Sequence, residues 1–184
     1  MSRAGFVLTG GLSSRMGRDK ALLPFQGGSL AGFVARLVTQ AAGSASLVGS
    51  AQRHAVVGYP VIEDLYPGEG PLGGILTALQ NTTADWNLIV ACDMPRLSTP
   101  FLTRLLEAAA DSGCGALVPA GPSGLLEPLC AVYHRHSLAV LGAAFGSGVR
   151  KVATALEGAR VTVLPVTEIT HFQNVNTAEE WANR

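Results

Sequence analysis

Short apolar runs alternate along the chain with segments in which apolar residues recur every three or four positions. A continuous apolar run is typical of a strand buried on both faces, whereas the longer period is typical of a helix with one buried side. The clearest run is "NLIVACD". We expect strands at 5–9, 45–49, 60–64, 87–93, 115–120, 129–134 and 160–166.

The periodic segments carry signals for helix ends. Ser29 is a residue type that caps helix N-termini, and Gly43 should end the helix that it starts. The apolar residues at helical spacing between them are Leu30, Phe33, Val34, Leu37 and Val38. Another helix should begin after Ser98 or Thr99, with Pro100 in its first turn. Further helices are expected at 73–80, 136–145, 149–157 and 177–183.

Strands that alternate with helices predict an α/β fold with a mostly parallel sheet covered on both faces. No linker, repeat or low-complexity segment divides the chain, so we expect one domain over residues 1–184. Ligands of such sheets bind at the carboxyl ends of the strands. The residues that follow the strands at 5–9 and 87–93 are therefore the first candidates for a site.

Composition limits the function classes. The 184 residues are 48% hydrophobic and 14% charged, which is too apolar for a disordered chain. Lys plus Arg and Asp plus Glu are both 13, so no overall charge attracts nucleic acid or a membrane surface. The apolar runs are far shorter than the roughly 20 residues of a membrane-spanning helix, and the N-terminus lacks the apolar region of a signal peptide. We expect a cytoplasmic protein without nucleic-acid or membrane partners.

The cysteines and histidines give no metal signature. Cys92, Cys114 and Cys130 are odd in number and form no C-x-x-C pair, so we interpret them as reduced, buried thiols. His134 and His136 form an H-x-H that His54 and His171 could join in a transition-metal site. No carboxylate or cysteine partner stands at ligand spacing, so strand-end polar histidines are the favoured interpretation.

The stretch "LTGGLSSRMGRDKALLPF" at 8–25 places glycines and cations directly after the first strand. Gly10, Gly11 and Gly17 let the backbone approach a ligand closely, while Arg15 and Lys20 neutralise negative charge. The pattern favours a nucleoside triphosphate. The alternative is a glycine-rich turn whose cations point into water, and the spacing is not that of a P-loop.

A G-x-G-x-x-G pattern, "GEGPLG", stands at 68–73, and Asp93 follows it at the roughly 20-residue distance of a ribose-binding acid. A dinucleotide-binding enzyme is thus a rival hypothesis. Against it, the pattern follows "DLYP" rather than a strong strand, and Pro71 removes one backbone N–H. A rigid Gly-Pro turn that leads into a helix and presses backbone groups against a planar base is the better interpretation.

Asp93, in "ACDMP", ends the most apolar strand beside Pro95. A carboxylate that faces a phosphate-binding loop is suited to Mg²⁺, which usually combines one or two carboxylates with substrate phosphates and water. The alternative role is a turn or helix-capping aspartate.

Five motifs in this order resemble the molybdenum cofactor guanylyltransferase family, the MobA proteins: "LTGGLSSRMGRDKALLPF", "DLYPGEGPLGGI", "ACDMP", "LEPLCAVYHR" and "FQNVNTAEEW". They cover nearly the whole chain. The resemblance implies a three-layer Rossmann-like nucleotidyltransferase fold and the joining of GTP and molybdopterin-bearing molybdenum cofactor into a guanine dinucleotide, with release of pyrophosphate. It also implies transient contacts with other cofactor-biosynthesis proteins or apoenzymes.

The resemblance also implies site residues. Lys20 and Arg15 would contact phosphates, Asp93 would hold Mg²⁺, and these three would be catalytic. Asn174 and Asn176, in "NVNT", would approach the reacting end of the nucleotide or the incoming pterin phosphate; a local turn that caps the last helix is their alternative role. The nucleotide-binding set would be Leu8, Thr9, Gly10, Gly11, Lys20, Asp64, Gly70, Pro71, Leu72 and Asp93. Two departures from the family pattern are Thr9, usually alanine, and Gln52, often asparagine, whose role stays open.

The expected chemistry matches the residue types. A phosphate monoester acceptor is already anionic near neutral pH, so no general base is needed, and the chain shows no obvious Ser-His-Asp or Cys-His arrangement. The runner-up hypothesis is cytidylyl transfer to the same cofactor or another MobA-like nucleotidyl transfer. The adjacent Gly10 and Gly11 and the "RDK" at 18–20 resemble the guanylyl branch more. A non-catalytic nucleotide-binding adapter is the third hypothesis.

Overall fold

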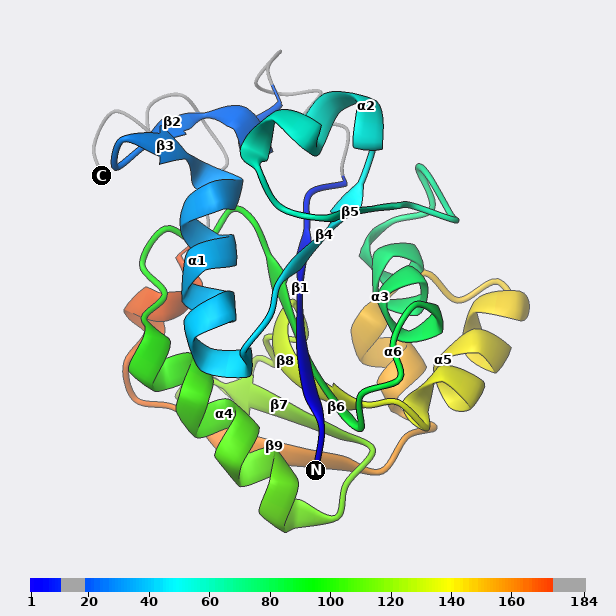
Figure 1. Ribbon diagram of the computed structural model, residues 1–184. Helices are drawn as coiled ribbons and strands as arrows, with labels where there is room; N and C mark the ends of the chain where they lie inside the picture. The colour runs from blue at the N-terminus through cyan, green and yellow to red at the C-terminus, as the bar shows by residue number, and fades with distance from the viewer. Residues whose placement is uncertain (11–18, 174–184) are drawn as a thin grey trace.

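The computed structural model describes residues 1–10 and 19–173 and contains a seven-stranded central sheet (Figure 1). Its order is β5-β4-β1-β6-β8-β7-β9, and only β8 runs against its neighbours. The bounds are β1 Arg3–Leu8, β4 Ser46–Gly49, β5 Val61–Glu63, β6 Trp86–Ala91, β7 Ala116–Ala120, β8 Cys130–His134 and β9 Val161–Pro165. The predicted α/β class with a mostly parallel sheet is confirmed.

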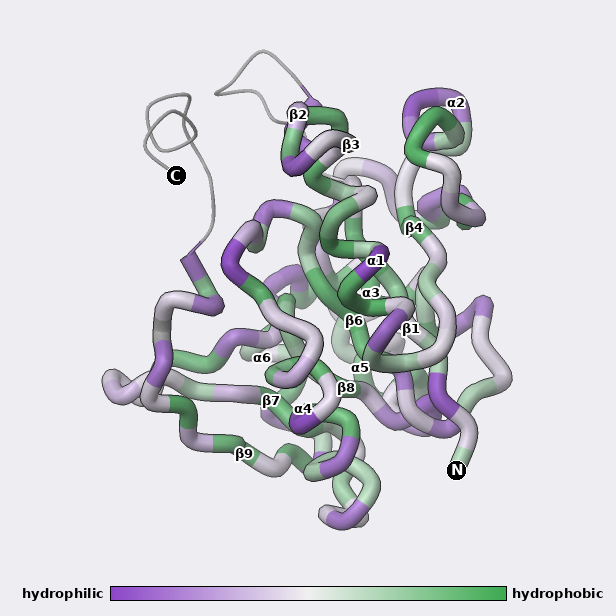
Figure 2. Tube along the Cα trace, turned by 60° about the vertical axis from the view of Figure 1, so that its left-hand side comes forward, coloured by the Kyte–Doolittle hydropathy of each residue, from purple (hydrophilic) through white to green (hydrophobic). Residues whose placement is uncertain are grey.

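Helices cover both faces of this sheet (Figure 1). α1 (Leu30–Ala42) and α4 (Thr99–Ser112) pack on one face, and α3 (Pro71–Gln80), α5 (Ser137–Gly146) and α6 (Val152–Leu156) pack on the other. Each face has its own apolar cluster because successive strand residues point to opposite sides. In β1, Val7 joins the α1 and α4 side, whereas Phe6 and Leu8 join the other. Hydrophobic residues accordingly gather along the inner strands in Figure 2.

The predicted helix ends are largely those observed. The Ser29 hydroxyl accepts a hydrogen bond from Gly32 N at 3.1 Å, and Gly43 ends α1 with a φ of 86°. Ser98 is the N-cap of α4, although its side chain makes no capping bond. Most strand bounds lie within one or two residues of the predictions. The helix expected at 177–183 lies outside the described residues.

Short elements between the long ones were not predicted. They are η1 (Lys20–Leu22), the hairpin strands β2 (Pro24–Phe25) and β3 (Gly28–Ser29), α2 (Ala51–His54), η2 (Ala55–Val57) and η3 (Ile169–Phe172). Elements of two to four residues are too short to display a period. Within residues 1–10 and 19–173, no helix combines the length and apolar character needed to cross a membrane.

Candidate functional site

Three parallel strands bring predicted site residues to one edge of the sheet. Thr9 and Gly10 follow β1, Asp64 follows β5 and Asp93 lies two residues after β6. Backbone hydrogen bonds tie these strand ends together: Thr9 N donates to Val48 O (2.9 Å), Asp64 N to Gly49 O (3.1 Å) and Cys92 N to Leu8 O (3.1 Å). The carboxyl ends of β1, β4, β5 and β6 are therefore held side by side by backbone hydrogen bonds, at the edge where this fold class binds ligands.

Lys20 and Asp93 meet across this edge. Lys20 Nζ donates to Asp93 Oδ2 at 3.5 Å, and both side chains are 19% exposed. Burial raises the pKa of the Asp93 carboxyl, and the Lys20 ammonium opposes that rise. A partly buried charge pair can exchange its internal contact for contacts to a charged ligand.

Asp64 is fixed by its surroundings. Its Oδ1 accepts hydrogen bonds from Tyr66 N (3.0 Å) and from the Thr77 hydroxyl (3.1 Å). A Cβ built on Gly10 would lie 3.4 Å from Asp64 Oδ2, so these two predicted residues adjoin. The structure thus brings the carboxylate expected near the nucleoside beside the glycine expected near the nucleotide.

The Gly-Pro turn at the start of α3 has the backbone expected of it. Gly70 has φ 82° and ψ −178°, a region that is essentially restricted to glycine, and Pro71 occupies the first turn of the helix. Leu72 and Leu8 are buried in the core, at 0% and 6% exposure. Their predicted nucleotide contacts therefore cannot involve their side chains, because both pack between α3 and the sheet.

The histidines differ in their surroundings. His134 ends β8 as expected and packs edge-on against Trp86, with His136 exposed beside it. His171, in η3 rather than at a strand end, stacks on Phe101 of α4. The interpretation as a strand-end residue is wrong for His54, which is fully buried in the short helix α2 and contacts both Thr9 and Asp19. This placement was not predictable, because the four residues of α2 are too few for a periodic pattern.

The part of the chain that the structure describes holds no group of three or more His, Cys, Asp or Glu side chains able to hold a metal ion. At the strand edge it offers separate carboxylates, of which that of Asp93 contacts Lys20. A lone carboxylate does not suit zinc, which takes three or four protein ligands, but it suits Mg²⁺, which takes its remaining ligands from substrate phosphates and water. The residues present fit the predicted magnesium.

Some predicted residues cannot be compared. Gly11, Arg15, Asn174 and Asn176 lie outside the described residues. Gln52 is exposed on α2, next to the buried His54. The cysteines match their interpretation, since Cys92, Cys114 and Cys130 are all buried and free.

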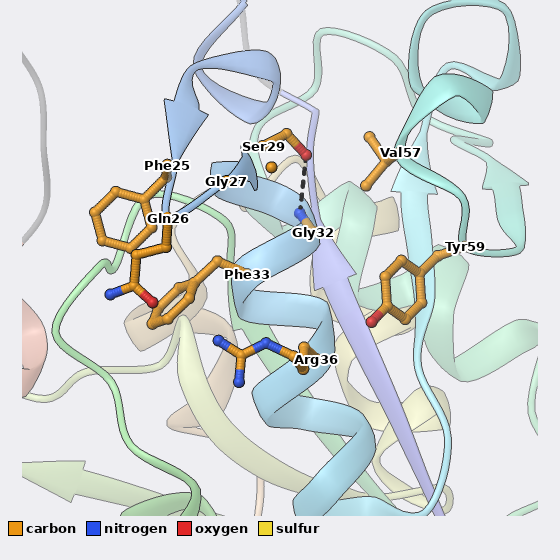
Figure 3. A pocket seen from close by; sticks show the side chains of 10 residues that line it. Phe25, Gln26, Gly27, Ser29, Gly32, Phe33, Arg36, Val57 and Tyr59 are labelled. Carbon is orange, nitrogen blue, oxygen red and sulfur yellow. Dashed lines mark hydrogen bonds between the residues drawn. The ribbon is translucent and has the colours of Figure 1, made fainter.

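A separate open hollow of about 270 Å³ lies beside the β2 and β3 hairpin (Figure 3). Phe25 and Phe33 form one wall, with ring centroids 4.7 Å apart, and Arg36 extends over the Phe33 ring. Val57 and Tyr59 approach it from the other side (Figure 3). Among the predicted site residues that the structure describes, none lines this hollow.

Known proteins resemble the chain over nearly its whole length. The model of the MobA-like NTP transferase domain matches residues 5–161. A "Probable molybdenum cofactor guanylyltransferase" of Bacillus cereus (strain Q1) is 34% identical over 188 residues, which cover 97% of this chain and 93% of the relative. The crystal structure of molybdopterin-guanine dinucleotide biosynthesis protein A from Archaeoglobus fulgidus has a TM-score of 0.83 at 27% identity, covering 98% and 95% of the two chains. A Mycobacterium tuberculosis H37Rv protein crystallised with manganese shares the fold, with a TM-score of 0.71 at 17% identity and coverage of 100% and 97%.

Proposed function

Because the chain belongs to the MobA-like NTP transferase family, we propose that it transfers GMP from GTP to molybdenum cofactor, giving the guanine dinucleotide cofactor and pyrophosphate. The observation that carries the proposal is the partly buried pair of Lys20 and Asp93 at the carboxyl edge of the sheet. It supplies one cation for phosphates and one carboxylate for a metal at the place where this fold binds ligands.

The reaction joins two anionic groups. An oxygen of the cofactor's terminal phosphate forms a bond to the α-phosphorus of GTP, while the bond from that phosphorus to the β-phosphate oxygen breaks and pyrophosphate leaves with the electron pair. The attacking oxygen is already anionic, so no protein base is required. The protein's task is to hold the groups in line and to neutralise charge, which Lys20 performs as a point charge on the phosphates.

Asp93 is the proposed ligand of a divalent cation, and we assign Mg²⁺. When bound, the cation would neutralise charge on the phosphates. Without it, Asp93 would repel an incoming triphosphate, and Lys20 offsets only part of that repulsion. Arg15 is proposed as a further phosphate contact.

The nucleoside end is proposed to lie over Gly10, Gly11 and Asp64, beside the turn formed by Gly70 and Pro71. Asp64 is an acceptor held rigid by Thr77 and Tyr66, which suits recognition of a polar edge or a ribose hydroxyl. Asn174 and Asn176 are proposed to serve the reacting end or the molybdopterin phosphate. Leu8, Thr9 and Leu72 would contribute through the backbone.

The wider setting follows from the same proposal. We propose that residues 1–184 act as a single nucleotidyltransferase domain in the cytoplasm, where the three free cysteines would stay reduced. Transient contacts with the proteins that supply the cofactor or receive the product complete the proposal.

The test is calorimetric titration of the protein with GTP, CTP and ATP, each with and without Mg²⁺, followed by assay of pyrophosphate release with molybdenum cofactor. Preference for GTP that depends on Mg²⁺, with turnover, is the expected result. Preference for CTP would keep the chemistry and replace the substrate. Tight binding without turnover would identify a nucleotide-binding adapter, and no binding would overturn the site.

A further inference from the structure

His54 joins two points of the chain that flank the glycine-rich segment. On one side, Thr9 Oγ1 lies 3.0 Å from His54 Nδ1. On the other, His54 Nε2 lies 3.0 Å from Asp19 Oδ2. Thr9 directly precedes Gly10, and Asp19 directly precedes Lys20. A single imidazole ring thus connects the entry of the segment 10–19 to its exit, and we name this Thr9-His54-Asp19 connection the His54 bridge.

The bridge is built into the core. His54 is fully buried and Thr9 is 5% exposed, so water does not compete for their hydrogen bonds. Thr9 Oγ1 also lies 2.9 Å from Val48 O on β4, and its one hydrogen serves one of these two contacts. Because Asp19 offers only acceptor oxygens as a carboxylate, Nε2 is the donor in its contact with Asp19.

Gly49 leaves the space that the bridge occupies. A Cβ at position 49 would overlap Thr9 Oγ1 and lie 2.9 Å from His54 Nδ1. Gly49 has no positive φ, so local backbone conformation does not demand glycine there. The need for glycine comes from the close approach of the hydroxyl and the ring.

Asp19 links His54 to the turn that begins at Lys20. It is the N-cap of η1, and its Oδ1 accepts a hydrogen bond from Ala21 N at 3.1 Å. Its other oxygen, Oδ2, faces His54 and, at 3.6 Å, the half-exposed guanidinium of Arg53. The carboxylate therefore holds the turn that carries Lys20 with one oxygen and the buried histidine with the other.

We propose that His54 is a positioning residue, which through Thr9 and Asp19 fixes both ends of the segment 10–19 and so keeps Lys20 opposite Asp93. The role rests on the proposed function, because it assigns Lys20 to the nucleotide phosphates. It explains why a polar side chain with 0% exposure ends the short helix α2: the ring contacts Thr9 with one nitrogen and Asp19 with the other.

The experiment compares Thr9→Val, which keeps the shape of residue 9 and removes its hydroxyl, with His54→Gln. Thr9→Ser is the conservative rescue, and Arg53→Ala is the matched control that removes only the exposed contact to Asp19. Each protein is assayed for KM and kcat with GTP, for thermal unfolding, and for hydrogen exchange of the Ala21, Leu22 and Leu23 amides, which close η1.

For Thr9→Val we expect about a fivefold rise in KM for GTP, the equivalent of one net hydrogen bond, with kcat within about twofold. His54→Gln should raise KM by about tenfold or more, because both contacts change. Both variants should accelerate exchange at the three amides. Thr9→Ser should recover most of the loss, and Arg53→Ala should resemble the wild type.

Unchanged exchange and unchanged KM in folded Thr9→Val protein would overturn the bridge as a positioning device, even if His54→Gln fails to fold. A fall in the unfolding midpoint with unchanged KM would show a purely structural role and overturn it equally. If the wild type neither binds nor turns over GTP, the proposed function fails, while the exchange of the three amides still reports whether the bridge holds η1.

Discussion

Lys20 Nζ lies 3.5 Å from Asp93 Oδ2, a contact between residues 73 positions apart that joins η1 to the end of the central strand β6. Both side chains are only 19% exposed, so the contact is partly shielded from water. In the proposed function, phosphates would contact the lysine and a cation would contact the carboxylate.

Removing the Asp93 charge should lower activity without lowering stability. Burial raises the pKa of Asp93, so the ionised carboxylate costs the folded state free energy above that pKa. Asp93→Asn should thus raise or preserve the unfolding midpoint near pH 7 while lowering turnover by about a hundredfold or more. Because the folded wild type binds its proton more tightly than the unfolded chain, the difference in midpoint should shrink as pH falls through the raised pKa.

Asp85→Asn is the matched control. Hydrogen bonds from Ser2 hold the pKa of Asp85 below its usual range, so its stabilising contribution is present above the unfolded-state pKa and disappears as pH falls through the lowered one. This variant should lose stability near neutral pH and keep its activity. Thermal scans of both variants from acid to neutral pH check the opposite signs, and equal pH trends would contradict the assignment.

Lys20→Met keeps the aliphatic stem of the side chain and removes its charge. We expect kcat/KM for GTP to fall by about a hundredfold, because the phosphates lose a preorganised cation in a shielded site. Lys151→Met removes an exposed lysine that precedes α6 and serves as the control. Steady-state pyrophosphate release measures both, and a Lys20→Met value within threefold of the wild type would refute the phosphate role.

Gly70→Ala should strain the turn before α3. A Cβ at this position would meet nothing within 4 Å, so the loss of stability comes from the backbone alone. Holding alanine at a φ of 82° with extended ψ should cost about 1–3 kcal/mol of unfolding free energy. Gly142→Ala, in the middle of α5 with equally open space, should stabilise the protein by about 0.5–1 kcal/mol. Urea unfolding measures both, and GTP affinity should fall only for Gly70→Ala.

The three thiols should resist modification in the native protein. Burial raises the pKa values of Cys92 and Cys130 far above their usual range, so thiolate is scarce even at mildly alkaline pH. A thiol reagent that produces a coloured product should react slowly with the folded chain and rapidly with all three residues in denaturant. A fast native phase would show that one thiol is more accessible than its position indicates.

The long strands and helices were predictable because each shows either a continuous apolar run or an apolar period of three to four residues. The run ending at Asp93 and the periodic residues of α1 identified a central strand and its covering helix, and Gly43 marked the helix end. The reversal of β8 was not predictable, because a fully buried antiparallel strand and a fully buried parallel one have the same apolar composition.

The contact of Lys20 with Asp93 and the positive φ of Gly70 follow from residue types that carry their own chemistry, while their roles toward a nucleotide stay predictions. The site was not predictable where the role arises from long-range contact. His54 lies 45 positions from Thr9 and 35 from Asp19, and no sequence period connects them. Leu8 and Leu72 are both buried, so the nucleotide contact expected of each stays a prediction for its backbone.

The interior position of β1 also has a consequence for synthesis on the ribosome. β1 precedes both of its partners in the chain: it pairs with β4 on one side and with β6, which starts at Trp86, on the other. At ~5–20 residues per second, the second partner follows roughly 4–16 s later. For that interval the apolar "GFVL" stretch has an unpaired edge, which exposes this strand to binding by chaperones.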